Sequence, residues 1–423
     1  MAKPENQTDP ESLRRFADMR FGIMFHWGPA VLRDNEISWS MSNRARYEAV
    51  YQKFNPKQFD PDAWAAVAST TGARYVVYVC KHHDGFCMWD TKTTDNNIMN
   101  TPFKRDVTRE LAGACRRQQI VFGTYLSIMD IHEAKWDRCY PARVEMPGYP
   151  EGIPHIEDIT ARQTLELLKQ YDSQIMWYDG AWLAGWRTGD SPGKVAAEIR
   201  ADNPNVLITR LGNAVDDYEC MEAKIGTYRS KPWEMVTSVA YPTYSYNTRI
   251  KYKSAAYFVQ TLSRVVCGNG NLLLNFVPDA EGAIPEEQMK IAREIGEWVK
   301  TNGAAIYGTR GGPWYPDTWG GSTRKNRSLF VYLLPDAPET LHLPPCGAKL
   351  LGSRVLGGGL ATVKQTDAGL ELSVPLNTRD PKVTIVELTM DAEVKDMIEA
   401  SKPQSPAKPK PASVPPPREE IPK

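Results

Sequence analysis

The feature that most constrains the fold is a series of short apolar runs separated by helical patterns. Six runs rich in β-branched and aromatic residues lie at FGIMF (21–25), YVVYVC (75–80), IVFGTYL (120–126), QIMWY (174–178), VLIT (206–209) and NLLLNF (271–276). Three segments between them, at 60–73, 105–119 and 158–172, place apolar residues at helical spacing. Strands that alternate with helices predict a parallel sheet with helices outside it. The spacing of the runs suits a (β/α)8-like (TIM) barrel with long loops, or a doubly wound sheet.

The chain changes character near residue 305. Short strand-like runs separated by Gly, Pro, Asp and Asn follow at LFVYLL (329–334), KLLGSRVL (349–356), LELSVPL (370–376) and KVTIVEL (382–388). They predict a small antiparallel β-domain. The last segment is too rich in proline to build a core and predicts a disordered tail. The expected division is an N-terminal extension at 1–14, a barrel at 15–305, a β-domain at 306–390 and the tail at 391–423.

Bulk composition narrows the class of partner. Basic and acidic residues both number 51, so the net charge is zero and neither a nucleic-acid nor a membrane-surface partner is indicated. The start, MAKPENQTDPESLRRF, has no apolar core of a signal peptide, and no run is long enough to span a membrane. The seven cysteines form no CxxC pair, which predicts buried free thiols rather than disulfides or a zinc site. The 12 Trp and 19 Tyr residues favour a large core, and their faces also suit stacking on sugars.

Polar and reactive side chains follow several of the predicted strands. His26 follows the first run, Lys81, His82 and His83 follow the second, and Asp179 follows the fourth. Four of the six histidines lie in such clusters, the fourth being at position 132 after the third run. In a barrel these positions share one rim, where active sites are built. The sequence therefore predicts a polar site at this rim.

The individual residues also have structural interpretations. An Asp-Gly pair after an apolar run is often only a turn, His82 and His83 could be a satisfied pair at a turn, and Lys81 could be a salt-bridge partner. Metal spacings such as HExxH are absent, so no metal is expected. With His26 on a neighbouring strand, the histidines are better interpreted as hydrogen-bonding groups for a polar ligand.

A carboxylate at the end of a buried strand suits a nucleophile or general base, and a second carboxylate would make a glycosidase pair. Asp179 is the first candidate. The acids between residues 215 and 239 supply candidates for the second, namely Asp216, Asp217, Glu219, Glu222 and Glu234. Glu234 follows Trp233, and a carboxyl packed against an indole is desolvated, which raises its pKa and suits a general acid. A surface carboxylate at a strand start explains Glu234 equally well.

Several motifs together resemble the α-L-fucosidases of glycoside hydrolase family 29. They are FGIMFHWG, GARYVVYVCKHHDGFCMWD, RDVTRELAGACRRQQIVFGTYLSIMDIH, IMWYDG, NPNVLITRLG, PWEMVTS, GNGNLLLNFVPDAEGAI and NGAAIYGTRGGPW, and they occur in the family's order over about residues 15–315. The resemblance implies a (β/α)8-like barrel followed by a β-sandwich. It also implies an exo-acting, retaining glycosidase that uses neither a metal nor an organic cofactor.

The resemblance assigns roles to residues of this chain. Asp179 takes the place of the nucleophile, and Glu234 is the expected acid/base, with Glu222 as the alternative. The positions that hold the deoxysugar are His26, Trp39, His82, His83 and Tyr125. The expected substrate-binding set is completed by Trp177, Trp233 and Arg229, with Arg210 as the alternative cation. The two catalytic carboxyl groups should lie about 5–5.5 Å apart.

Three departures from the family pattern concern loops near the sugar. Ile37-Ser38-Trp39 stands where the family shows Glu-Trp, and the segments at 130–133 and 243–246 also differ. They leave an exo-α-L-galactosidase, or a hydrolase of sulfated algal (fucoidan-type) sugars, as alternatives. A catalytically inactive carbohydrate-binding barrel is a third. The expected partner is a fucosylated oligosaccharide or polysaccharide. The oligomeric state stays open, and a secreted or periplasmic location fits if a leader has been removed.

Overall fold

The structure is a computed structural model that describes residues 8–139, 149–183, 185–186, 189–212, 214–225 and 227–403. The described residues form two compact units. The first contains the chain up to Ile225 together with Ser230–Ala255 and Gly270–Lys300. The second contains residues 227–229, Ala256–Asn269 and the chain from Thr301 onward.

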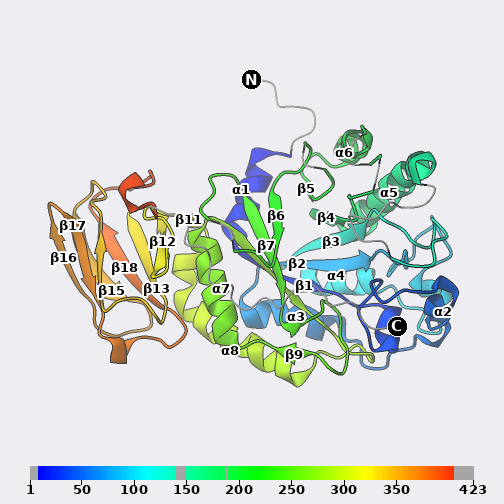
Figure 1. Cartoon of the computed structure of the whole chain (residues 1–423), viewed down its shortest axis with the longest axis horizontal. Coiled ribbons are helices and arrows are strands. Elements are labelled where there is room, and N and C mark those ends of the chain that lie inside the picture. The colour runs from blue at the N-terminus through cyan, green and yellow to red at the C-terminus, as the bar shows by residue number, and fades with distance from the viewer. Residues whose placement is uncertain are drawn as a thin grey trace. The chain divides into compact units, whose positions relative to one another are not determined.

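The first unit is built on an eight-stranded sheet in which every pairing is parallel (Figure 1). Its strands, as described, are β1 (Phe21–Phe25), β2 (Tyr75–Lys81), β3 (Val121–Ser127), β4 (Ile175–Asp179), β5 (Leu207–Thr209), β6 (Glu219–Glu222), β7 (Trp233–Ser238) and β10 (Asn271–Phe276). The order across the sheet is β5-β4-β3-β2-β1-β10-β7-β6. β1 and β10 are the first and last of these strands in the chain, and they pair with each other. The sheet therefore curls into a nearly closed barrel whose edges are β5 and β6. This order confirms the (β/α)8-like barrel and excludes the doubly wound sheet.

The helices begin and end where local chemistry predicts. The Asp60 carboxylate accepts two backbone N–H groups at the start of α3 (Pro61–Thr71), and Gly72 ends that helix in the left-handed region at φ 85°. Asp106 caps α4 (Val107–Arg117) in the same way. The other helices are α1 (Pro10–Met19), α2 (Arg44–Glu48), α5 (Tyr149–Tyr171), α6 (Ser191–Asp202), α7 (Ala255–Cys267) and α8 (Glu286–Ile306).

Strands β6 and β7 are the barrel strands that the apolar runs do not reveal. The sequence of β6 is ECME, with an acid at each end, and β7 reads WEMVTS with a buried glutamate in second place. Neither segment is a continuous apolar run, because β6 is an edge strand and β7 buries a carboxyl group. A short antiparallel pair, β8 (Ala240–Tyr241) and β9 (Lys251–Tyr252), follows them.

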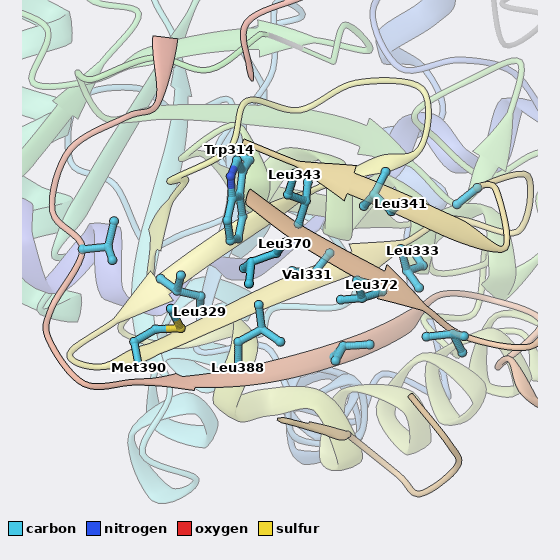
Figure 2. Close-up of a cluster of buried hydrophobic side chains, with 14 of the residues drawn as sticks. Trp314, Leu329, Val331, Leu333, Leu341, Leu343, Leu370, Leu372, Leu388 and Met390 are labelled. Atoms are coloured by element: carbon cyan, nitrogen blue, oxygen red, sulfur yellow. The ribbon is translucent and has the colours of Figure 1, made fainter. Parts of the chain in front are cut away.

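The second unit contains two antiparallel sheets packed as a sandwich. The five-stranded sheet has the order β11-β12-β13-β18-β15 and the three-stranded sheet the order β14-β17-β16. Figure 2 shows their shared core, in which leucines, a valine and a methionine from both sheets gather with Trp314. The strands are β11 (Arg310–Gly311), β12 (Gly320–Lys325), β13 (Ser328–Leu333), β14 (Thr340–Leu343), β15 (Leu350–Val355), β16 (Thr362–Thr366), β17 (Gly369–Ser373) and β18 (Thr384–Met390). The predicted β-domain is therefore a β-sandwich.

Other expectations from the sequence have different outcomes. All seven cysteines are free thiols and five of them are buried, as predicted. None of the described helices combines the length and apolarity needed to cross a membrane. The last twenty residues of the predicted tail lie outside the described residues, and the proposed division of the chain at 14, 305 and 390 stays a prediction.

Candidate active site

Side chains from four neighbouring strands converge at the carboxyl-terminal rim of the barrel. His26 follows β1, His82 and His83 follow β2, Tyr125 lies near the end of β3, and Asp179 is the last residue of β4. Ring centroids lie 5.8 Å apart for His26 and His82, 4.1 Å for His82 and His83, and 5.8 Å for His26 and Tyr125. The structure thus brings together five of the residues predicted for the site, as the rim of a parallel barrel requires.

Asp179 is held as an ionised carboxylate. Arg210 Nη2 donates to its Oδ1 at 2.7 Å, Tyr125 Oη donates to its Oδ2 at 2.9 Å, and His83 Nε2 lies 3.8 Å from Oδ2. Burial alone would raise the pKa of Asp179, but the charge of Arg210 and the hydrogen bonds from Arg210 and Tyr125 favour the ionised form, and the net pKa is lowered. The side chain remains 16% exposed, so a ligand can reach it.

The tautomer of His26 follows from its partner. Nδ1 lies 2.7 Å from Asn275 Oδ1. The Asn275 amide nitrogen donates to Ser238 Oγ and to the carbonyl of Tyr244, which leaves its oxygen facing the ring. His26 Nδ1 therefore carries the proton, and Nε2 presents a lone pair.

The tautomer of His83 follows from Ser127. Its Nδ1 lies 2.7 Å from Ser127 Oγ. The Ser127 hydroxyl uses its proton on the carbonyl of Met129 at 2.6 Å, so it accepts from His83 Nδ1. The Nε2 atom of His83 thus has a lone pair, and it is buried with no hydrogen-bond partner. A ligand hydroxyl would satisfy it.

His82 has the opposite tautomer. Ser38 Oγ lies 2.7 Å from its Nδ1 and already accepts the backbone N–H of Asp84 at 2.9 Å. The Ser38 proton is then available for His82 Nδ1, which leaves the proton on Nε2. Burial lowers the pKa of His26 and of His83 to about 4 and that of His82 well below its usual value, so all three rings are neutral near pH 7. Together they offer two acceptors and one donor, a pattern suited to hydroxyl groups.

Aromatic rings lie beside these histidines and add apolar surface to the site. Trp39 lies edge-on to His83 at 5.2 Å and stacks on Trp182 at 6.2 Å between centroids. Tyr244 lies 5.5 Å from His26. Trp39 was predicted for the site, whereas Trp182 and Tyr244 were not. Trp182 lies just after the Asp-Gly pair that follows β4. Its position beside a predicted strand end could therefore have indicated that it belongs to the site.

A cleft of about 1240 Å³ adjoins Asp179. Its walls come from the loop after β4, the start of α6, the loop after β5 and the residues before β7. They include Trp182, Trp186, Arg210 and Lys231. The cleft lies between the two edges of the barrel sheet and is large enough for several sugar rings.

The Lys81 ammonium has a structural role at the site. It forms an ion pair with Asp130 at 3.0 Å, and both side chains are at most 1% exposed. This confirms the salt-bridge interpretation of Lys81. His132 pairs with Glu48 at 2.8 Å and has no described contact with Asp179. In the described part of the chain, no group of three or more His, Cys, Asp or Glu side chains is arranged to hold a metal ion.

The structure corrects the expected places of Glu234 and Trp233. They are the second and first residues of β7, so they lie at the end of the strand away from the rim. Glu234 is 0% exposed and Trp233 is 1% exposed. Desolvation does raise the pKa of Glu234, to about 7, as predicted, but the indole that contacts it is that of Trp177, because consecutive strand residues point to opposite faces. With these exposed fractions, neither the Glu234 carboxyl group nor the Trp233 ring is open to solvent at the rim.

Arg229 and Trp177 also belong to the predicted substrate-binding set. Arg229 belongs to the second compact unit, where its backbone bonds to Gly268 and Asn269. The cation beside Asp179 is Arg210, the alternative. Trp177 is 3% exposed and lies beneath Tyr125, so it supports the site from below.

The remaining acids between residues 215 and 239 differ in their contacts and in how they lie relative to the rim. Asp217 pairs with buried Arg200 at 2.8 Å, and Asp216 accepts the backbone N–H groups of the loop after β5. Glu219 begins β6 and Glu222 ends it, so of the two only Glu222 lies toward the rim. Its side chain is exposed. Burial raises the pKa of the neighbouring Tyr125 hydroxyl, and the charge of Glu222 contributes to that rise.

Replacing Arg210 with glutamine should move the acid limb of the pH–rate profile to higher pH. Without the guanidinium, burial raises the pKa of Asp179, so the carboxylate becomes protonated, and activity falls, at a higher pH than in the parent enzyme. Profiles of kcat/KM against pH measure the shift. Arg229→Gln is the matched control and should leave the limb in place. An unmoved limb in Arg210→Gln would show that another group controls it.

Comparisons with known proteins give the family. A family model described as alpha-L-fucosidase matches residues 2–304. An alpha-L-fucosidase of Dictyostelium discoideum is 24% identical over 88% of this chain and 87% of its own length. The human plasma alpha-L-fucosidase is 25% identical over 89% and 86%.

Solved structures show the same fold. Alpha-L-fucosidase isoenzyme 1 from Paenibacillus thiaminolyticus superposes with a TM-score of 0.79 at 29% identity, covering 90% of this chain and 99% of the other. A Thermotoga maritima alpha-fucosidase in complex with a mechanism-based inhibitor gives 0.74 at 27% identity, covering 90% and 99%. The barrel, the sandwich and these relatives define a glycoside hydrolase. The chain belongs to the alpha-L-fucosidase family, glycoside hydrolase family 29.

Proposed function

We propose that this protein is a retaining, exo-acting α-L-fucosidase that releases terminal α-L-fucosyl residues from glycans. The observation that carries the proposal is the Asp179 carboxylate, kept ionised by Arg210 and Tyr125 at a rim lined with neutral histidines. A buried but reachable carboxylate is a suitable nucleophile. Family membership and the inhibitor complex of the Thermotoga relative support the same reaction.

In the first step, an oxygen of Asp179 attacks the anomeric carbon. The bond from that carbon to the leaving oxygen breaks, and Glu222 gives its proton to that oxygen. A glycosyl ester forms on Asp179. In the second step, Glu222 takes a proton from water, the water oxygen attacks the anomeric carbon, and the carboxylate of Asp179 leaves. Two inversions give net retention.

Glu222 replaces Glu234 as the proposed acid/base because of where the two acids lie. Glu222 ends β6 on the rim side and is exposed, as a group that exchanges protons with a leaving group and with water must be. Its charge also acts on Tyr244 and Arg210, which face the site. Glu234 has no exposed surface.

The histidines and aromatic rings suit a deoxysugar. The lone pairs of His26 and His83 would accept hydroxyl protons, and Nε2–H of His82 would donate to a hydroxyl oxygen. Trp39 and Trp182 offer apolar faces for the sugar ring and its methyl group. The cleft beside Asp179 would hold the remainder of a fucosylated oligosaccharide or polysaccharide.

Hydrolysis of aryl α-L-fucoside and aryl α-L-galactoside under identical conditions tests the substrate, and NMR of the first sugar released tests the stereochemistry. We expect the fucoside to have the higher kcat/KM and the α-anomer to appear first. Faster turnover of the galactoside would establish the galactosidase alternative. Tight fucose binding without turnover would establish an inactive carbohydrate-binding barrel, and a β-anomer first would exclude retention.

A further inference from the structure

Glu234 is a buried carboxyl group that the proposed reaction does not use. It lies inside the barrel, where β7 pairs with β6 and β10. Trp177 Nε1 donates to its Oε1 at 3.0 Å, and Tyr75 Oη donates to its Oε2 at 2.6 Å. Cys220 Sγ also donates to Oε1 at 3.9 Å, so donors from three strands hold the carboxyl group. A carboxyl group held in this way has one fixed orientation.

Trp177 connects this buried group to the rim. It precedes Asp179 by two residues on β4 and so points to the same side of the strand. Tyr125 stacks on its indole at 5.1 Å with an interplanar angle of 17°. The Arg210 guanidinium lies over the same ring at 4.6 Å from its centroid. Both groups that donate to Asp179 thus rest on one indole.

The indole depends on Glu234 for its orientation. Trp177 is 3% exposed, so its N–H has no access to bulk water and needs a protein acceptor. Without the carboxyl oxygen, the N–H would be buried and unpaired, and the ring would move to relieve that cost. Any tilt of the ring would displace Tyr125 and Arg210 together, because both pack on it.

We propose that Glu234 is a positioning residue: it anchors the Trp177 indole and through it aligns the two donors, Tyr125 and Arg210, that hold Asp179. This inference rests on the proposed role of Asp179 as nucleophile. It gives Glu234 an indirect part in glycosyl transfer and removes it from proton transfer to the leaving group. The other charged or titratable groups that face it are Tyr75, Tyr218, Cys220 and Arg210.

Paired substitutions test the anchor. Glu234→Gln keeps an oxygen for the Trp177 N–H and should retain kcat within about fivefold, whereas Glu234→Met, which has no acceptor of that kind, should lower kcat about 10²-fold. In Glu234→Met the KM should change little, and the acid limb of the pH–rate profile should move to higher pH. Tyr75→Phe removes the other hydrogen bond to the same carboxyl group, so it should move the limb in the same direction but by less, because the Trp177 N–H keeps its acceptor.

A double-mutant cycle separates this role from general damage to the barrel. Trp177→Phe removes the N–H, so adding Glu234→Met should cost much less than it does alone. Fully additive losses, or rescue of Glu234→Met by azide, would overturn the inference. If Glu234→Met does not fold, Glu234→Gln and Trp177→Phe are compared in the same assays. A retained kcat in Glu234→Gln with a lowered kcat and a shifted acid limb in Trp177→Phe supports the anchor, and equal kcat and an unmoved limb in both variants contradict it. An inactive Asp179→Asn beside a fully active Glu234→Met would refute the anchor alone, while an active Asp179→Asn would refute the proposed function itself.

Discussion

Replacing Asp179 with asparagine should lower kcat for an aryl α-L-fucoside by at least about 10³-fold, because the amide cannot form the glycosyl ester. The substituted side chain keeps the volume of the original and can still accept from Tyr125, so the fold should persist. Steady-state kinetics measures the loss, and circular dichroism checks the fold. Asp172→Asn is the matched control, since Asp172 is exposed and precedes the same strand. It should retain parent activity.

The product formed with azide gives a second test of Asp179 as the nucleophile. In Asp179→Ala, azide can enter the space left by the carboxylate and attack the anomeric carbon directly. A single displacement inverts the configuration, so the product should be β-L-fucosyl azide, identified by NMR. Recovery of α-L-fucosyl azide from this variant would mean that another residue still forms the covalent intermediate, and the assignment of Asp179 would be wrong.

Replacing Glu222 with alanine should produce a loss that depends on the leaving group. A general acid contributes about 10²–10⁴-fold where the leaving oxygen needs a proton. Fucosylated oligosaccharides should therefore lose that factor in kcat/KM, while a 2,4-dinitrophenyl fucoside, which leaves without protonation, should lose little. The loss of the acid/base should also remove the alkaline limb of the pH–rate profile.

Azide distinguishes the two candidate acids. In Glu222→Ala it should attack the glycosyl ester on Asp179 and give α-L-fucosyl azide with recovered turnover. Glu219→Ala, at the opposite end of β6 and on the wall of the cleft, is the comparison variant and should show no azide rescue with aryl substrates. Azide rescue of Glu234→Ala in place of Glu222→Ala would return the acid/base role to Glu234.

The sequence predicted those parts of the fold that form mostly apolar runs. β1, β2 and β10 are buried along their whole length, so their runs stand out, and each observed strand begins at the first residue of its predicted run. β6 and β7 carry glutamates, so neither appears as an apolar run, and a strand at β7 was considered only in the alternative that places Glu234 at a strand start. Barrel position therefore could not be used to rank the acids within them.

The choice between Glu234 and Glu222 shows what the sequence could not indicate about the site. The raised pKa of Glu234 was predicted from the adjacent Trp233, whereas burial in the barrel causes it, and neither could indicate from the sequence which end of the barrel the residue occupies. Strand position decides this, because only the carboxyl end of a barrel strand faces the ligand. Arg210 follows β5 directly, so the rule that found His26 and Asp179 would also have favoured it over Arg229.

The most direct test of the account is covalent trapping. The enzyme is incubated with 2-deoxy-2-fluoro-α-L-fucosyl fluoride, digested, and mapped by mass spectrometry. The account predicts a single fluorofucosyl adduct on Asp179, formed more slowly in Arg210→Gln and absent in Asp179→Asn. An adduct on any other carboxylate, or its persistence in Asp179→Asn, would contradict it.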